Sequence, residues 1–100
     1  MICWQNASRG EQKQLAAISI FLSHSPHLVD FLFNPAVPKL NDSPDELVAR
    51  ARGLSSGDFL LVRLALNLWC CGGGLEVHEI FEAEPEVLGS IFRALALLAA

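Results

Sequence analysis

Residues 54–72 read LSSGDFLLVRLALNLWCCG, and this stretch decides the fold. It opens with a serine cap at Ser55 and ends at a glycine, a natural C-terminal stop for a helix. Beyond its first turn only Arg63 and Asn67 are polar, and they lie four residues apart on one stripe. A helix that is apolar almost all round is a buried helix. We therefore expect a central helix over about 56–71, around which the other elements pack.

Short capping patterns predict where the helices before this segment begin. Ser8-Arg-Gly-Glu11 and Ser43-Pro-Asp-Glu46 both have the Ser-x-x-Glu form of a capping box, which satisfies two free backbone N–H groups at a helix start. Ser25 precedes Pro26, so this serine is expected to cap a short second helix that ends before Pro35. Prolines then predict an extended loop up to the second capping box.

The last quarter of the chain is expected to hold two more helices. Residues 75–81 place apolar side chains at helical spacing, although alternation at Leu75-Glu-Val77-His leaves a strand open; we favour the helix. Pro85 begins the final helix. Its inward seam is expected to consist of Leu88, Ile91, Leu95 and Leu98.

These elements predict an all-α fold, a compact bundle of five or six short helices around the buried central helix. We expect residues 1–100 to form one domain, with 1–8 as a flexible N-terminal segment. The chain is 52% hydrophobic and only 18% charged, which excludes disorder. That excess indicates either an unusually complete core or a surface that a second chain covers.

The charge is small and unevenly placed. The net charge is −4, with seven scattered lysines and arginines, so a phosphate-binding surface and a nucleic-acid partner are not expected. All of the excess negative charge lies in residues 73–100, which we interpret as a solvated face rather than a docking site for a basic partner. No stretch reaches the roughly 18 apolar residues of a membrane span. Without a signal-peptide pattern either, we expect a soluble cytoplasmic protein with no membrane partner.

Two groups of residues are candidates for a chemical site. Cys70, Cys71 and His78 could form a metal or thiol site, but four zinc ligands are lacking and core packing is the favoured role of the thiols. His24 and His27 share a helix junction without a third ligand. The chain has three cysteines, two of which are neighbours, and this pattern does not predict a set of disulfides. It fits a reducing compartment. No catalytic constellation, cofactor or metal is predicted.

The function we expect is that of a small, non-catalytic, self-associating interaction module. The solvent face of the last helix is expected to hold Glu86, Ser90 and Arg93, and Leu97 then falls where the next polar residue belongs. A twofold dimer would bury such a leucine. The partner-binding residues predicted on this basis are Ile91, Arg93, Leu97 and Leu98. A nucleic-acid-associated regulator that uses the helix pair 75–99 is an alternative.

Overall fold

A computed structural model describes residues 6–100 and places six helices in them. Their bounds are α1 (Arg9–Leu22), α2 (His27–Leu32), α3 (Pro44–Ala51), α4 (Ser56–Cys70), the 3₁₀ helix η1 (Val77–Glu82) and α5 (Pro85–Ala99). The prediction of an all-α bundle of five or six helices is confirmed. Most of the flexible segment predicted for 1–8 lies outside the described residues, because the structure does not describe residues 1–5, among them Cys3.

Serine caps begin three of these helices where the sequence predicts them. At α1 the capping box is complete, because the Glu11 amide donates to Ser8 Oγ at 3.1 Å and the Ser8 amide donates to Glu11 Oε1 at 2.9 Å. At α3 only half of it forms: Ser43 Oγ accepts from the Glu46 amide, while Asp42 takes the Ser43 N–H. Ser55 caps α4 in the same way.

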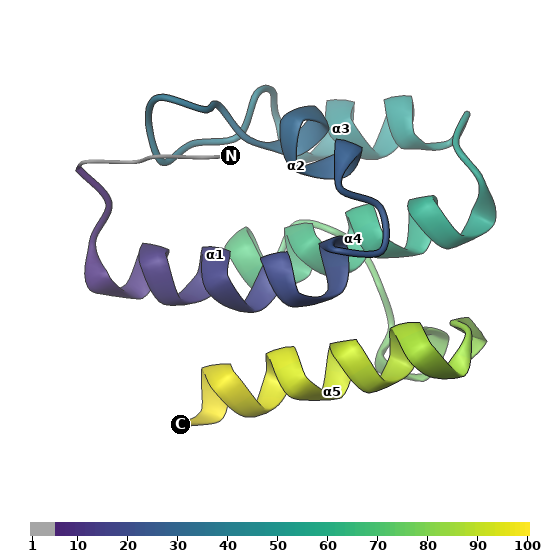
Figure 1. The fold of residues 1–100 in the computed structure, drawn as a ribbon. Helices are drawn as coiled ribbons and strands as arrows, with labels where there is room; N and C mark the ends of the chain where they lie inside the picture. The colour runs from purple at the N-terminus through teal and green to yellow at the C-terminus, as the bar shows by residue number, and fades with distance from the viewer. Residues whose placement is uncertain (1–5) are drawn as a thin grey trace.

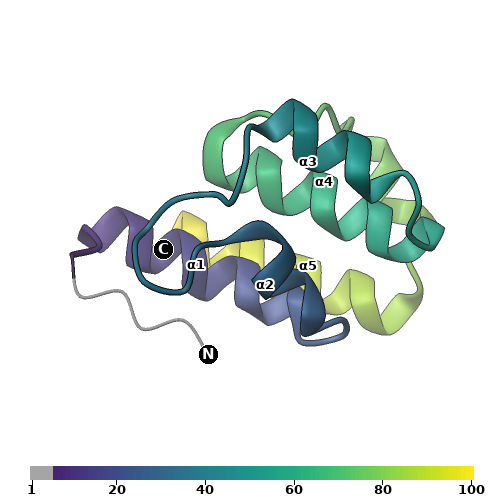
Figure 2. The ribbon, with the colours of Figure 1, turned by 90° about the horizontal axis from the view of Figure 1, so that it is seen from above.

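The central helix α4 packs against α1, α2 and α3, as Figure 1 shows. Its buried face carries Leu60, Leu61, Val62, Leu64, Ala65 and Leu66. The last helix, α5, packs on α1 instead and runs antiparallel to it (Figures 1 and 2). The core is therefore organised by two neighbouring helices, α1 and α4, because α1 also joins α5 to the rest. No helix among the described residues has both the length and the apolar character needed to cross a bilayer.

The rotation of α5 about its axis differs from the prediction. Ser90, expected on the solvent face, is buried, and Leu95, expected in the seam, is 36% exposed. Leu97 is half-buried and packs on the core, so the expectation that it faces solvent is wrong. Ser90 can lie inside because its hydroxyl bonds to His24 Nε2 at 2.8 Å, which satisfies the buried oxygen.

The segment after α4 contains a helix rather than a strand, which settles the alternative left open by the sequence. Glu76 is extended, and Val77–Glu82 then form the 3₁₀ turns of η1. A 3₁₀ helix has three residues per turn, so the residue four positions on does not return to the same face. Ile80 is buried while Val77 and Phe81 are exposed, although α-helical spacing would place all three together. The 3₁₀ turn accounts for the separation of Phe81 from Val77, whereas the exposure of Val77, three positions before Ile80, belongs to the first position of the helix.

Candidate functional site

The polar stripe of α4 holds the glycine connection that follows the helix. Arg63 Nε donates to the Gly73 carbonyl at 3.3 Å and an Arg63 terminal nitrogen to the Gly74 carbonyl at 2.6 Å. Asn67 accepts from the Gly73 amide at 2.9 Å and donates to the Leu75 carbonyl at 2.9 Å. The two polar residues in an otherwise apolar helix thus have a structural role, because they satisfy backbone groups of the connection.

The same arginine forms an ion pair with η1. Its guanidinium contacts both carboxylate oxygens of Glu79, at 3.2 and 3.1 Å. The pKa of Glu79 is lowered, first by the hydrogen bond from the Glu76 amide and second by that from Arg63, since both favour the ionised form. Arg63 therefore joins α4, the glycine connection and η1 through a single side chain.

The left-handed residue that ends α4 is Cys71, with φ of 61°, and not the expected Gly72. The glycines that follow are required by close approach. A Cβ on Gly73 would lie 1.8 Å from the Arg63 carbonyl oxygen, and one on Gly72 would lie 2.8 Å from a carbon of Pro44. Only glycine allows the connection to lie so close to α3 and α4.

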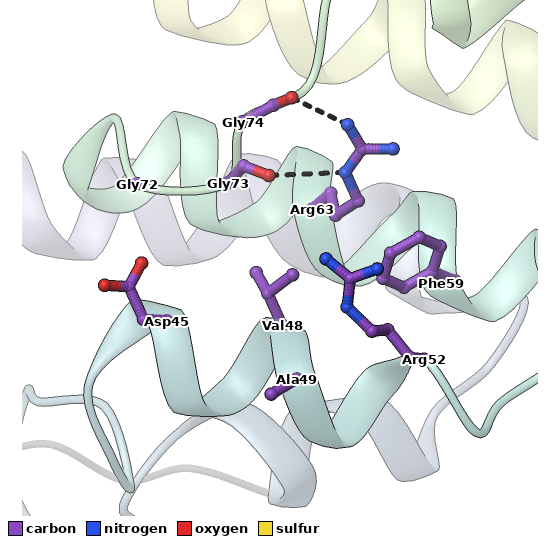
Figure 3. A pocket seen from close by; sticks show the side chains of 9 residues that line it. All are labelled: Asp45, Val48, Ala49, Arg52, Phe59, Arg63, Gly72, Gly73 and Gly74. Atoms are coloured by element: carbon purple, nitrogen blue, oxygen red, sulfur yellow. Dashed lines mark hydrogen bonds between the residues drawn. The ribbon is translucent and has the colours of Figure 1, made fainter.

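A groove of about 520 Å³ lies between α3 and the glycine connection (Figure 3). Its charged groups are Asp45 in the first turn of α3, Arg52 at the C-cap of α3, and Arg63. Val48 and Phe59 supply apolar lining. The guanidinium carbon of Arg52 is 6.0 Å from the centre of the Phe59 ring. The lining contains no hydroxyl, thiol or imidazole group, and its titratable side chains are Asp45, Arg52 and Arg63.

The structure does not support a metal or thiol site at Cys70, Cys71 and His78. Cys70 and Cys71 are free thiols and both are exposed, so their expected role in core packing is wrong. His78 is exposed on η1. No three cysteine, histidine or acidic side chains within residues 6–100 lie together in a way that could hold a metal ion.

The histidine junction forms a polar cluster with the start of α4. Ser25 Oγ donates to Asp58 Oδ1 at 2.6 Å, and His27 Nε2 lies 3.1 Å from Asp58 Oδ2. The prediction that Ser25 caps α2 is therefore wrong, because the Asp58 carboxylate engages its hydroxyl. In a nucleophilic triad the imidazole stands between serine and carboxylate. Here the carboxylate stands in the middle, which suits a link between α2 and α4.

Large apolar side chains are exposed together along η1 and α5. We call this surface the outer aromatic face and define it as the exposed Val77, Phe81, Phe92 and Leu95 together with the half-buried Leu88. Phe81 is 62% and Phe92 is 47% exposed, and their ring centres lie 6.2 Å apart. Leu88 and Leu95 lie four residues before and three after Phe92, on the same side of α5.

The predicted partner-binding residues fall on different sides of α5. Ile91 is completely buried, and Leu97 and Leu98 are half-buried against the core. Arg93 is exposed and donates to Ser90 Oγ at 2.9 Å. Phe81 is missing from the predicted set, because its helical spacing indicated an inward side chain, whereas its ring is 62% exposed on η1.

The nucleic-acid alternative has little basic surface to use. In the described part of the chain after residue 73, Arg93 is the single basic residue other than histidine, beside five glutamates. Recognition of a duplex needs several phosphate contacts from such groups. Comparisons of the chain with protein families, with characterised proteins and with solved structures find no match.

Proposed function

We propose that this protein is a small helical interaction module that self-associates, and that the occupant of its outer aromatic face is a second copy of the chain. The observation that carries the proposal is the pair of neighbouring rings, Phe81 and Phe92, that meet solvent. Other large apolar side chains form the core, whereas these two rings lie outside it and contact each other. Aromatic side chains are enriched at protein interfaces because they bury a large area.

A second copy suits this face for two reasons. A twofold interface uses the same surface on both chains, and closed twofold pairs are the commonest oligomers. The charged residues beside the face also include both signs, since Glu86 and Arg93 are both exposed on α5. A surface with both signs can be complementary to itself, whereas an entirely acidic rim would repel its own copy.

The experiment that tests self-association is sedimentation equilibrium on three proteins. We expect wild type to dimerise and Phe92→Glu to be monomeric with the same helix content, because the charge would be buried in the interface. Val37→Glu is the matched control, since Val37 is 39% exposed in the loop before α3. This variant should dimerise like wild type. A Phe92→Glu protein that dimerises with unchanged affinity would contradict the proposed face.

We also propose a cytoplasmic location and a non-catalytic role. The exposed free thiols of Cys70 and Cys71 support a reducing compartment. Thiol titration of protein isolated without reductant should find both groups reduced, and a disulfide on either would argue against this location. The groove lining has one carboxylate, Asp45, and no hydroxyl, thiol or imidazole group to act with it, which supports a role in binding rather than chemistry.

A further inference from the structure

We infer that the two copies pair α5 against α5 in antiparallel fashion, with Arg93 of each copy bound to Glu86 of the other. This inference rests on the proposed self-association and specifies its geometry. Both residues are exposed on α5, and the carboxylate of Glu86 has no hydrogen bond or ion pair within residues 6–100. Arg93 uses one nitrogen for Ser90 and has further N–H groups to donate.

The symmetry of the pair selects which rows of side chains meet. A twofold axis perpendicular to α5 reverses the helix direction and keeps each flank of the helix against the same flank of the second copy. The apolar row of Leu88, Phe92 and Leu95 then meets itself. The charged row of Glu86 and Arg93 also meets itself, on the other side of Gly89 and Ala96. These two small residues leave room for a second helix to approach.

The charged row fixes the register. Glu86 and Arg93 are seven residues apart, which is about 10.5 Å along the helix. An axis between Gly89 and Ser90 sets Arg93 opposite Glu86 of the second copy. The same axis brings Phe92 to within one residue of Leu88 of the second copy and leaves Leu95 beside the start of the second α5. Charge complementarity therefore favours this antiparallel arrangement over a shifted or parallel one.

Charge exchange tests the register. The dissociation constant of the dimer is measured by sedimentation equilibrium for wild type, Arg93→Glu, Glu86→Arg and the double variant. Each single variant loses two ion pairs and gains two like-charge contacts, so we expect its dissociation constant to rise about tenfold. The double variant restores both pairs with their signs exchanged and should return to within about threefold of wild type. Glu46→Arg is the control, since Glu46 occupies the first turn of α3 as Glu86 does in α5.

The dissociation constants of these variants test the antiparallel register separately from the proposed self-association. Circular dichroism checks that each variant keeps the helix content of wild type. If a charge-reversal variant unfolds, Arg93→Gln and Glu86→Gln are measured in its place. Recovery in the double variant, with Glu46→Arg unchanged, supports the antiparallel register. A wild-type dimer that Phe92→Glu disrupts, but in which the double variant shows no recovery, overturns the register alone. A monomeric wild type overturns both the register and the self-association.

Discussion

Replacement of Gly73 by alanine tests how tightly the glycine connection is held. The added Cβ would lie 1.8 Å from the Arg63 carbonyl oxygen, where ordinary contacts begin at 3.4 Å. The backbone must therefore move by roughly 1.5 Å, which is more than a hydrogen bond tolerates. Such a movement breaks the four hydrogen bonds that Arg63 and Asn67 make to Gly73, Gly74 and Leu75.

At about 0.5–1.5 kcal/mol for each of the four bonds, we expect Gly73→Ala to lower the free energy of unfolding by about 2–6 kcal/mol. Urea denaturation followed by circular dichroism measures this loss. Gly57→Ala is the matched control. Gly57 lies in the first turn of α4, and a Cβ at this position would meet no atom within 4 Å. Alanine there should leave stability unchanged or raise it by up to about 1 kcal/mol. A loss below about 1 kcal/mol in Gly73→Ala would refute the reasoning.

Three further predictions concern caps, acid stability and the orientation of α5. Ser43→Ala and Ser55→Ala should each destabilise the fold by roughly 0.5–2 kcal/mol in urea denaturation, and unchanged midpoints would show that the caps contribute nothing. Because the folded-state pKa of Glu79 is lowered, its ionised form stabilises the fold above the ordinary carboxyl range, and this contribution is lost as the pH falls through the folded pKa. Glu79→Gln should therefore flatten the loss of stability on acidification, and an identical acid profile would exclude this role. Leu97→Glu should cost roughly 1–3 kcal/mol, since Leu97 packs on the core, whereas a fully stable variant would place that side chain in solvent.

Local chemistry made much of the fold predictable. The caps at Ser8, Ser43 and Ser55 depend on atoms within three residues of each serine, so the sequence contains the whole interaction. The burial of α4 was equally readable, because a helix with apolar residues on nearly every side has no solvent face.

Contacts between distant residues account for what the sequence did not reveal. Ser90 is buried because a histidine 66 positions away bonds to it, and Ser25 leaves its cap position for Asp58, 33 positions away. Periodicity alone treats both serines as exposed or local groups. The outer aromatic face was missed because periodicity groups Phe81 with Ile80 on the inward side, whereas only Ile80 is buried.

The acidic excess of the last quarter limits how the interaction surface works. Glu79 is neutralised by Arg63 within the chain, whereas Glu82, Glu84 and Glu86 remain exposed near the outer aromatic face. The proposed self-association would therefore bring like charges together, with Arg93 as the residue that offsets them. The strength of the proposed dimer should then depend on salt, because ions screen exposed charges over about 10 Å at 0.1 M.

The central claim, that the chain pairs with itself, is tested most directly by the molar mass of the wild-type protein in solution. Light scattering is recorded on the full chain over a concentration series that reaches high micromolar. The account predicts a mass that rises with concentration toward twice the chain mass of 10.9 kDa. A mass that stays at 10.9 kDa across the whole series would contradict it.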